Sequence, residues 1–210
     1  MKKLLLSLIA VSALAFSTQA QTEKGNFMLG GNVQFSTQKN DGAPKTDINF
    51  NVVPSIGYFI SNNFAVGTGV GYQFAKSYNT TAVDGVVSGS STKVSAFVVS
   101  PFARYYKNIT DQFKFYGQLS VPMSFGTTKD GDANGDNFVK VSKDNNVGVA
   151  LSPGFAFFPS KKFGIEFSVQ GISYNDQSFK DANDNKIGGT KDFSIGANFF
   201  NPNLGVQFFF

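Results

Sequence analysis

Apolar residues recur at every second position along most of this 210-residue chain. Such an alternation is typical of β-strands whose two faces meet different surroundings. In the segment 48–58, one face would carry Ile48, Phe50, Val52, Pro54, Ile56 and Tyr58, and the other Asn49, Asn51, Val53, Ser55 and Gly57. The alternation therefore predicts an all-β chain.

The same pattern predicts eight strands. Three of them start near residues 27, 48 and 64, and the others lie near 95–107, 113–126, 147–158, 163–174 and in a last segment that ends at Phe210. Long polar connections alternate with short ones, the long ones near 37–47, 77–93, 127–146 and 175–191, the short ones at 61–63, 108–112 and 159–162. Short turns on one side and long loops on the other are typical of an antiparallel up-and-down transmembrane β-barrel, whose strands need roughly 9 to 11 residues to cross.

The distribution of charge favours a membrane barrel over a soluble one. The only charged residues in the predicted strand cores are Arg104, Lys114 and Glu166, and the less bulky face consists of Gly, Ala, Ser, Asn and Gln. A soluble barrel needs a charged outer surface, whereas small and amide side chains fit the interior of an eight-stranded barrel. We therefore expect the Phe, Val, Ile and Leu face to contact outer-membrane lipid, and a soluble periplasmic ligand-binding barrel is the alternative.

The first residues indicate export. Lys2 and Lys3 precede an apolar stretch up to Phe16, and small residues before Ala20 suit cleavage, as in a secretory signal peptide. We expect residues 1–20 to be removed and residues 21–210 to form one barrel domain in the outer membrane. There is no Cys for a disulfide or a lipid anchor. Without the two signal lysines the formal net charge falls from +4 to +2, which gives no support for a nucleic-acid partner.

Two features near the short connections carry structural expectations. Pro54, Pro101 and Pro153 fall inside predicted strands, where a proline removes a ladder hydrogen bond, so we expect a bulge or relaxed pairing at each. Aromatic residues crowd the same region and predict an interfacial girdle made of Tyr58, Phe59, Phe64, Tyr105, Tyr106, Phe113, Phe157 and Phe163.

Four segments together resemble a known family: PSIGYFISNNFAVG at 54–67, SPFARYYKNI at 100–109, SPGFAFFPSKKFGIE at 152–166 and LGVQFFF at 204–210. They are similar to the small outer-membrane β-barrel proteins, the OmpA- and OmpX-type porin-like domains of Gram-negative bacteria, over residues 21–210. The resemblance implies membrane integration by the barrel-assembly machinery, for which the C-terminal signal would be Leu204, Val206, Phe208 and Phe210. The outward face shifts from odd to even numbering around 200–203, which predicts a bulge or kink.

Arg104, Glu166 and Lys114 are the candidate lumen residues. Arg104 and Glu166 are both predicted to point inward a few residues from a short turn, with Lys114 nearby. We expect an ion pair within a polar network that fills the lumen, because an eight-stranded interior is just wide enough for its own side chains. A gate or a narrow conduction path is the alternative.

A second candidate site lies in the third long connection. Asp130, Asp132, Asn134 and Asp136 place oxygen ligands at alternate positions around Gly135, like the first half of a calcium loop. Val141 stands where the bidentate Glu would be needed, so we expect an Asp/Asn/Gly turn and keep calcium as the alternative. A weaker version of the pattern is Asp181, Asn183 and Asn185.

The chain has no His, the commonest general base and a frequent metal ligand, so we expect neither an enzyme nor a cofactor. The function expected is that of an integral outer-membrane protein with a structural or surface-contact role, whose external loops could meet an unidentified surface partner. The alternative is a small pore or a carrier for an apolar ligand, with a continuous cavity along the small inward residues Gly67, Gly69, Gly71 and Gly148.

Overall fold

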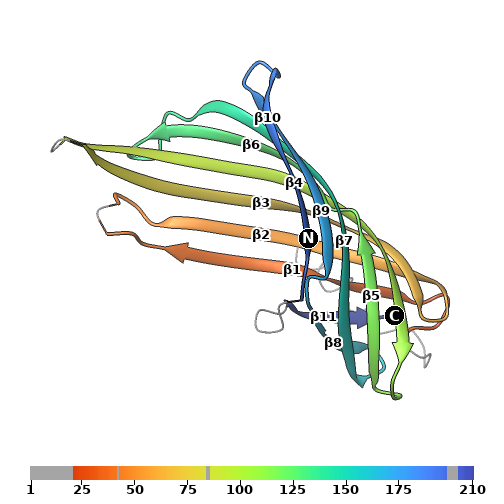
Figure 1. The fold of residues 1–210 in the computed structure, drawn as a ribbon. Helices are drawn as coiled ribbons and strands as arrows, with labels where there is room; N and C mark the ends of the chain where they lie inside the picture. Colours follow the sequence, from red (N-terminus) through yellow and green to blue (C-terminus); the bar gives the residue numbers. More distant parts are fainter. Residues whose placement is uncertain (1–20, 42, 84–85, 198–202) are drawn as a thin grey trace, which may run out of the picture.

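The structure, a computed structural model, describes residues 21–210 apart from 42, 84–85 and 198–202. The predicted signal peptide, residues 1–20, thus lies outside the described residues. The described residues form these strands (Figure 1): β1 (Phe27–Gln38), β2 (Asp47–Ser61), β3 (Phe64–Val83), β4 (Val86–Asn108), β5 (Phe113–Ser120), β6 (Met123–Asp132), β7 (Val139–Ser160), β8 (Phe163–Ser168), β9 (Ile172–Asp181), β10 (Lys186–Ile195) and β11 (Asn203–Phe209).

All strand pairs are antiparallel. β1 to β4 pair in sequence, β4 pairs with both β5 and β6, and both of these pair with β7. β7 then pairs with β8 and β9, which pair with β11 and β10 respectively. β5 and β6 are therefore two parts of one barrel strand, as are β8 with β9 and β10 with β11. Pairing of β11 with β1 closes a barrel of eight antiparallel strands, which confirms the predicted fold class.

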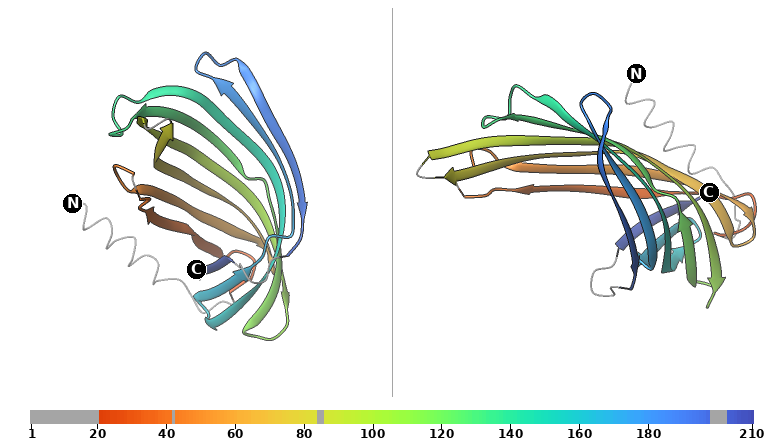
Figure 2. Two further views of the ribbon diagram at one scale, coloured as in Figure 1. Left: turned by 60° about the vertical axis from the view of Figure 1, so that its left-hand side comes forward. Right: turned by 45° about the horizontal axis from the view of Figure 1, so that its top comes forward.

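The closing contact lies at the end of the barrel that carries the short turns. There Met28 pairs with Phe209 and Leu29 pairs with Phe208. Farther along, β10 pairs only with β9 among the described residues, and β1 and β10 diverge toward the other end (Figures 1 and 2). By the rule for outer-membrane barrels, the end with the short turns faces the periplasm and the end with the long hairpins faces outward.

Large apolar side chains cover the outer face of every strand. Val66 of β3, Phe97 of β4 and Leu151 of β7 are 36%, 49% and 44% exposed, and similar side chains continue around the sheet to Val206 and Phe208 of β11. Apolar exposure on this scale suits contact with lipid and not with water. No helix in the described residues is long and apolar enough to cross a membrane.

Each strand proline lies at an irregular position. Pro54 is opposite Gly31, whose positive φ of 134° is accessible to glycine. Pro101 faces the gap between β5 and β6, and Pro153 faces the gap between β8 and β9, across which the register of β7 shifts by one residue. Proline lacks an N–H donor, so the pairing relaxes at these positions as expected.

The shift of the outward face near the C-terminus is also present. Ile195 of β10 is exposed on the outer face, whereas Leu204, Val206 and Phe208 are the exposed large apolar residues of β11. Ile172 pairs with Ile195, but Ser168 pairs with Asn203. Between these two pairs, the last barrel strand (β10 with β11) therefore contains four more residues than the strand beside it (β8 with β9). Of the predicted bulge at 200–203, residues 200–202 lie outside the described residues.

The outer connections are shorter than the sequence predicted. β3 and β4 continue as a paired hairpin to Val83 and Val86, which leaves little of the predicted 77–93 loop. Likewise only 133–138 and 182–185 separate the neighbouring strands inside the predicted 127–146 and 175–191 loops. The prediction was wrong because water surrounds both faces of these extensions. Polar residues then suit either face, and the alternation that marks a strand disappears while the backbone pairing continues.

Candidate functional site

The periplasmic half of the barrel is filled by side chains. Its buried apolar cluster consists of Met28, Phe59, Ala65, Tyr106, Tyr116, Ala156, Phe158 and Phe209, with Phe102 packed against it. The Tyr106 ring lies 5.5 Å from the Tyr116 ring and 6.4 Å from the Phe158 ring, measured between centroids. Side chains from strands around the barrel thus meet in the centre of the lumen.

This cluster corrects part of the predicted girdle. Phe59 and Tyr106 are both 0% exposed and point into the lumen. Their neighbours Tyr58 and Tyr105 are 38% and 54% exposed on the outer face, as a girdle requires. The prediction failed for Phe59 and Tyr106 because adjacent residues of a strand point to opposite faces, so two consecutive aromatic residues cannot both face lipid.

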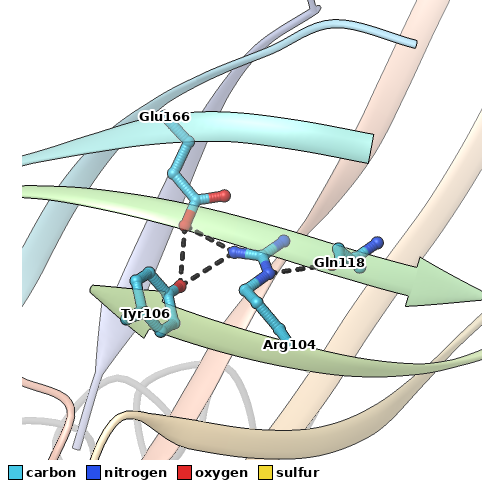
Figure 3. Close-up of polar contacts among 4 residues, drawn as sticks. All are labelled: Arg104, Tyr106, Gln118 and Glu166. Carbon is cyan, nitrogen blue, oxygen red and sulfur yellow. Dashed lines mark hydrogen bonds and ion pairs between the residues drawn. The ribbon is translucent and has the colours of Figure 1, made fainter. Parts of the chain in front are cut away.

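Arg104 and Glu166 form an ion pair above this cluster (Figure 3). Arg104 Nη1 lies 2.6 Å from Glu166 Oε1, and both side chains are less than a tenth exposed. The Tyr106 hydroxyl accepts a hydrogen bond from Arg104 Nη1 at 2.9 Å and donates one to Glu166 Oε1 at 3.0 Å. Arg104 Nε donates to Gln118 Oε1 at 2.8 Å. The structure therefore brings together two of the three predicted lumen residues and adds two neutral partners.

The guanidinium of Arg104 is also enclosed by rings. Its Cζ lies 4.4 Å from the Tyr116 ring centroid and 5.8 Å from that of Phe102. Stacking of this kind stabilises a desolvated cation. The buried charge is thus balanced by one carboxylate, two polar partners and the faces of aromatic rings, and it occupies the middle of the lumen.

Lys114 lies apart from this network. Its Nζ donates to Thr22 Oγ1 at 2.5 Å and to Asn63 Oδ1 at 3.5 Å, near the periplasmic turns. Thr22 Oγ1 in turn donates to Asn63 Oδ1 at 2.6 Å. Lys114 therefore fastens the segment before β1 to the turn between β2 and β3.

The segment 21–26 crosses the periplasmic mouth of the barrel. The backbone amide of Asn63 donates to the backbone oxygen of Thr22 at 2.7 Å, and the backbone amide of Gly25 donates to that of Phe59 at 2.9 Å. On the other side, Gln21 Nε2 donates to the backbone oxygen of Ser160, the last residue of β7, at 3.1 Å. These bonds link turns on two sides of the mouth, so the segment forms a cover beneath the apolar cluster.

Sequence reasoning missed four of these residues: Thr22, Asn63, Tyr106 and Gln118. A signal existed for Tyr106, because it lies two residues from Arg104 and so shares its face. Gln118 is opposite Arg104 in the register, which sequence spacing alone does not fix. Nothing in the sequence indicated that Thr22 would meet Lys114, which is 92 residues away.

The extracellular half of the lumen is polar and less filled. Gln34, Asn51 and Gln73 lie opposite one another on β1, β2 and β3 and line a hollow of about 360 Å³. Asn51 Nδ2 donates to Asn32 Oδ1 at 2.9 Å. This hollow does not continue along the glycine row that a pore would use. The space beside Gly67 is occupied by the Phe102 ring, and that beside Gly148 by the Asn175 side chain.

The predicted calcium loop forms a hydrogen-bonded turn between β6 and β7. Asp132 Oδ1 accepts from the amides of Asn134 and Asp136 at 2.9 and 3.0 Å, and Asp132 Oδ2 accepts from Asn137 Nδ2 at 2.8 Å. These bonds lower the pKa of Asp132, and the bond from the Asp136 backbone amide has the largest effect. Asp130 lies on β6 and accepts from Thr92 at 3.1 Å.

The turn between β9 and β10 repeats this arrangement. Asp181 Oδ1 accepts from the amides of Asn183 and Asn185, and Asp181 Oδ2 accepts from Asn185 Nδ2. These bonds lower the pKa of Asp181 as well. No group of three or more carboxylates suited to a metal ion occurs in the part of the chain that the structure describes. Calcium at Asp130, Asp132, Asn134 and Asp136 stays a prediction, and their hydrogen bonds already account for the turn.

The side chains of the C-terminal strand β11 alternate between the outer face and the lumen, as the predicted assembly signal would require. Leu204, Val206 and Phe208 point outward, whereas Gln207 and Phe209 are buried inside. Phe210 and Phe27 exchange backbone hydrogen bonds of 2.9 and 3.0 Å, which fixes the last residue to the start of β1. Recognition of this strand by the barrel-assembly machinery stays a prediction.

Residues 6–209 match a family model described as "Outer membrane protein beta-barrel domain". No curated protein matches the chain significantly. Among solved structures, the chain is similar to OprG from Pseudomonas aeruginosa, with 16% identity, 91% of this chain and 99% of that chain covered, and a TM-score of 0.46. It is also similar to neisserial surface protein A (14% identity, 88% and 99% covered, TM-score 0.43).

A third similar structure is Ail, the attachment invasion locus protein of Yersinia pestis, in complex with the heparin analogue sucrose octasulfate. It is 18% identical, with 89% of this chain and 99% of that chain covered and a TM-score of 0.38. All three structures are so distant from this chain that they carry no argument about its function.

Proposed function

This chain belongs to the outer membrane protein β-barrel family, and we propose that it serves as a sealed, non-enzymatic anchor that presents extracellular hairpins for contacts at the cell surface. Integral outer-membrane localisation follows from the family and from the apolar outer face. It rules out the soluble periplasmic barrel that the sequence had left open.

The observation that carries the proposal is the filled periplasmic half of the lumen. The Arg104–Glu166 ion pair, the apolar cluster and the cover formed by residues 21–26 follow one another toward the periplasm. A solute that entered from outside would reach the polar hollow beside Asn51 and stop above Phe102 and Arg104. This arrangement supports an anchor over a pore or a carrier across the barrel.

The extracellular side offers a large surface instead. β3 and β4 contain 20 and 23 residues, about twice the number needed to cross the apolar part of a membrane. Turns capped by Asp132 and Asp181 hold two neighbouring hairpins in defined conformations. Ordered hairpins of this kind present a fixed surface, which a contact function needs and which lipid anchoring alone would not.

Shortening one hairpin tests the contact function. Tyr78 pairs with Ser91, so deletion of 79–90 and insertion of a two-residue Asn-Gly turn keeps the register of β3 and β4. We expect cells that produce this variant to lose attachment to surfaces and to each other, relative to cells that produce the native chain. A matched deletion of 182–185 with the same turn reports whether the effect belongs to one hairpin. Equal attachment by all three strains would contradict the contact function, provided that heat-modifiable protein is present in equal amounts.

A further inference from the structure

Four lysines lie directly opposite one another on four neighbouring strands. Lys76 of β3 pairs with Lys93 of β4, Lys93 pairs with Lys129 of β6, and Lys129 pairs with Lys140 of β7. Opposite residues of an antiparallel pair share one face, with Cβ atoms roughly 5 Å apart, and like charges in this position destabilise the sheet. We call these four residues the lysine row.

Lys76, Lys93 and Lys129 of the lysine row lie on the outer side of the strands. Lys76 is four residues from Tyr72 and Lys93 is four residues from Phe97, and both aromatic residues are more than two-fifths exposed on the outer face. The register of β3 with β4 is unbroken between these positions, so the period of two keeps the lysines on the same side. Lys129 is likewise four residues from Phe125 of β6, which is exposed on the outer face.

The lysine row also lies at a defined depth. On β3 the outward residues from Phe64 to Phe74 span eleven positions, which is the length that a tilted strand needs to cross the apolar layer. Lys76 is the first outward residue beyond Phe74, and the register places Lys93 and Lys129 at the same level. The row therefore lies where the headgroups of the outer leaflet begin.

In the part of the chain that the structure describes, three lysines of the row have no acidic partner. On the same face, Asp176 of β9 is opposite Lys191 of β10 and pairs with it at 3.4 Å, which is the usual arrangement of opposite residues. Among the described residues, no carboxylate lies within ion-pair distance of the Nζ atom of Lys76, Lys93 or Lys129. At the end of the row, Lys140 lies near Asp184, which pairs with Lys143.

The contacts that these lysines make do not neutralise their positive charge. Lys76 Nζ donates to Gly135 O at 3.0 Å and lies 5.0 Å from the centroid of the Phe138 ring. Lys93 Nζ lies 5.8 Å from the same ring, so two ammonium groups gather at one aromatic side chain. Carbonyl and ring contacts orient ammonium groups but carry no net negative charge.

We propose that the lysine row binds the phosphate groups of the outer-leaflet glycolipid headgroups. The row lies on the outer face of the barrel at headgroup level, beside the β6–β7 turn that contributes Gly135 and Phe138, and its ammonium groups stand at the spacing of adjacent strands. A phosphate has several acceptor oxygens and bridges two such ammonium groups. A bound anion also removes the repulsion between opposite lysines, which explains how the row persists in the folded sheet. The proposal depends on the outer-membrane location and not on the contact function.

The proposal predicts that one substitution raises the unfolding temperature in one lipid and lowers it in another. Lys93 has a lysine on each side, so Lys93→Gln removes repulsion on two sides. In zwitterionic phosphatidylcholine vesicles at low salt, we expect K93Q to unfold at a higher temperature than the native chain. In vesicles that also contain diphosphoryl lipid A, we expect the native chain to gain stability and K93Q to become the less stable of the two.

The experiment measures the unfolding midpoint of the mature chain by heat modifiability in both vesicle types. The triple variant K76Q/K93Q/K129Q is compared with K24Q/K107Q/K161Q, which removes three positive charges near the periplasmic end. We expect diphosphoryl lipid A to raise the midpoint of the native chain and of the periplasmic control, and to have little effect on the triple variant. An equal shift in all three proteins would overturn the proposal.

Two further arms identify the source of the phosphate. Lipid A without phosphates should leave the native midpoint unchanged, and inorganic phosphate added to phosphatidylcholine vesicles should not reproduce the shift. A full shift with dephosphorylated lipid A would show that acyl chains and not phosphates are recognised. A full shift with inorganic phosphate would show a general anion site and overturn the assignment to lipid headgroups.

Discussion

The Tyr106 hydroxyl donates a 3.0 Å hydrogen bond to Glu166 across the lumen, from β4 to β8, while it accepts one from Arg104. A phenol has one donor and can accept as well, so it fits between a guanidinium and a carboxylate without leaving a polar atom unpaired. This relationship joins opposite walls of the barrel at the level where the lumen is sealed.

Glu166→Gln should destabilise the barrel strongly. The substitution leaves the Arg104 charge buried without a counter-charge, and breaking such a pair costs about 3 to 5 kcal/mol. Urea unfolding of the variant in lipid vesicles, followed by tyrosine fluorescence or by the folded gel band, measures the change. The double variant R104L/E166M removes both charges and should recover most of the loss. A single variant as stable as the native chain would mean that the ion pair does not hold the lumen together.

Tyr106→Phe should have a smaller effect. Arg104 and Glu166 keep their direct contact, so neither charge loses its counter-charge, and we expect a loss of about 1.5 to 3 kcal/mol, the usual contribution of a hydrogen bond to a charged group. The neighbouring substitution Tyr105→Phe is the control, because Tyr105 is 54% exposed on the outer face. The same urea measurement should separate the two variants, and equal stabilities would show that the Tyr106 hydroxyl is dispensable.

Val66→Arg should block membrane assembly. Val66 is exposed on the outer face of β3, within the apolar band, where an arginine costs about 2 to 4 kcal/mol. Gln73→Arg on the same strand is the matched control, because Gln73 lines the polar hollow. Cell fractionation with boiled and unboiled gel samples checks the result. Normal assembly of V66R, or failure of both variants, would contradict the assignment of the two faces.

The Asp132 turn should lose order in acid. The pKa of Asp132 is lowered by the amide hydrogen bonds that its carboxylate accepts, so protonation is harder in the folded turn than in the unfolded chain. The stabilisation is therefore complete above the ordinary carboxyl pKa and is lost as the pH falls through the lowered one. Hydrogen exchange at the Asn134 and Asp136 amides should be slow at neutral pH and accelerate in this acid range, beyond the intrinsic change. Asp132→Ala should remove the protection at neutral pH, and unchanged protection in that variant would show that the carboxylate does not hold the turn.

Sequence periodicity was enough to predict the strands that cross the membrane, because lipid on one side and a crowded lumen on the other give each face a different composition. The same reasoning placed Arg104 and Glu166 inside, since a charge in a crossing strand has to avoid lipid. It failed for the extensions of β3 and β4, where water lies on both faces. It also failed for Phe59 and Tyr106, because aromatic content near a turn was given more weight than alternation.

Contacts that depend on strand register or on a distant segment could not be predicted from the sequence. The Lys114–Thr22 bond needs the segment before β1 to cross the barrel mouth, which no local pattern indicates. The lysine row appears only once the register is known, because its members are spread over 65 positions, from Lys76 to Lys140. Opposite placement of four like charges is a property of the fold and not of any one strand.

Conductance of the purified mature chain in planar lipid bilayers tests the central claim, that the lumen is sealed, most directly. We predict no discrete channels from heat-modifiable, folded protein across a range of voltages and salt concentrations. Stable single-channel steps from the native chain would contradict the claim and would make the barrel a pore, with the path running past Phe102 and the Arg104–Glu166 pair.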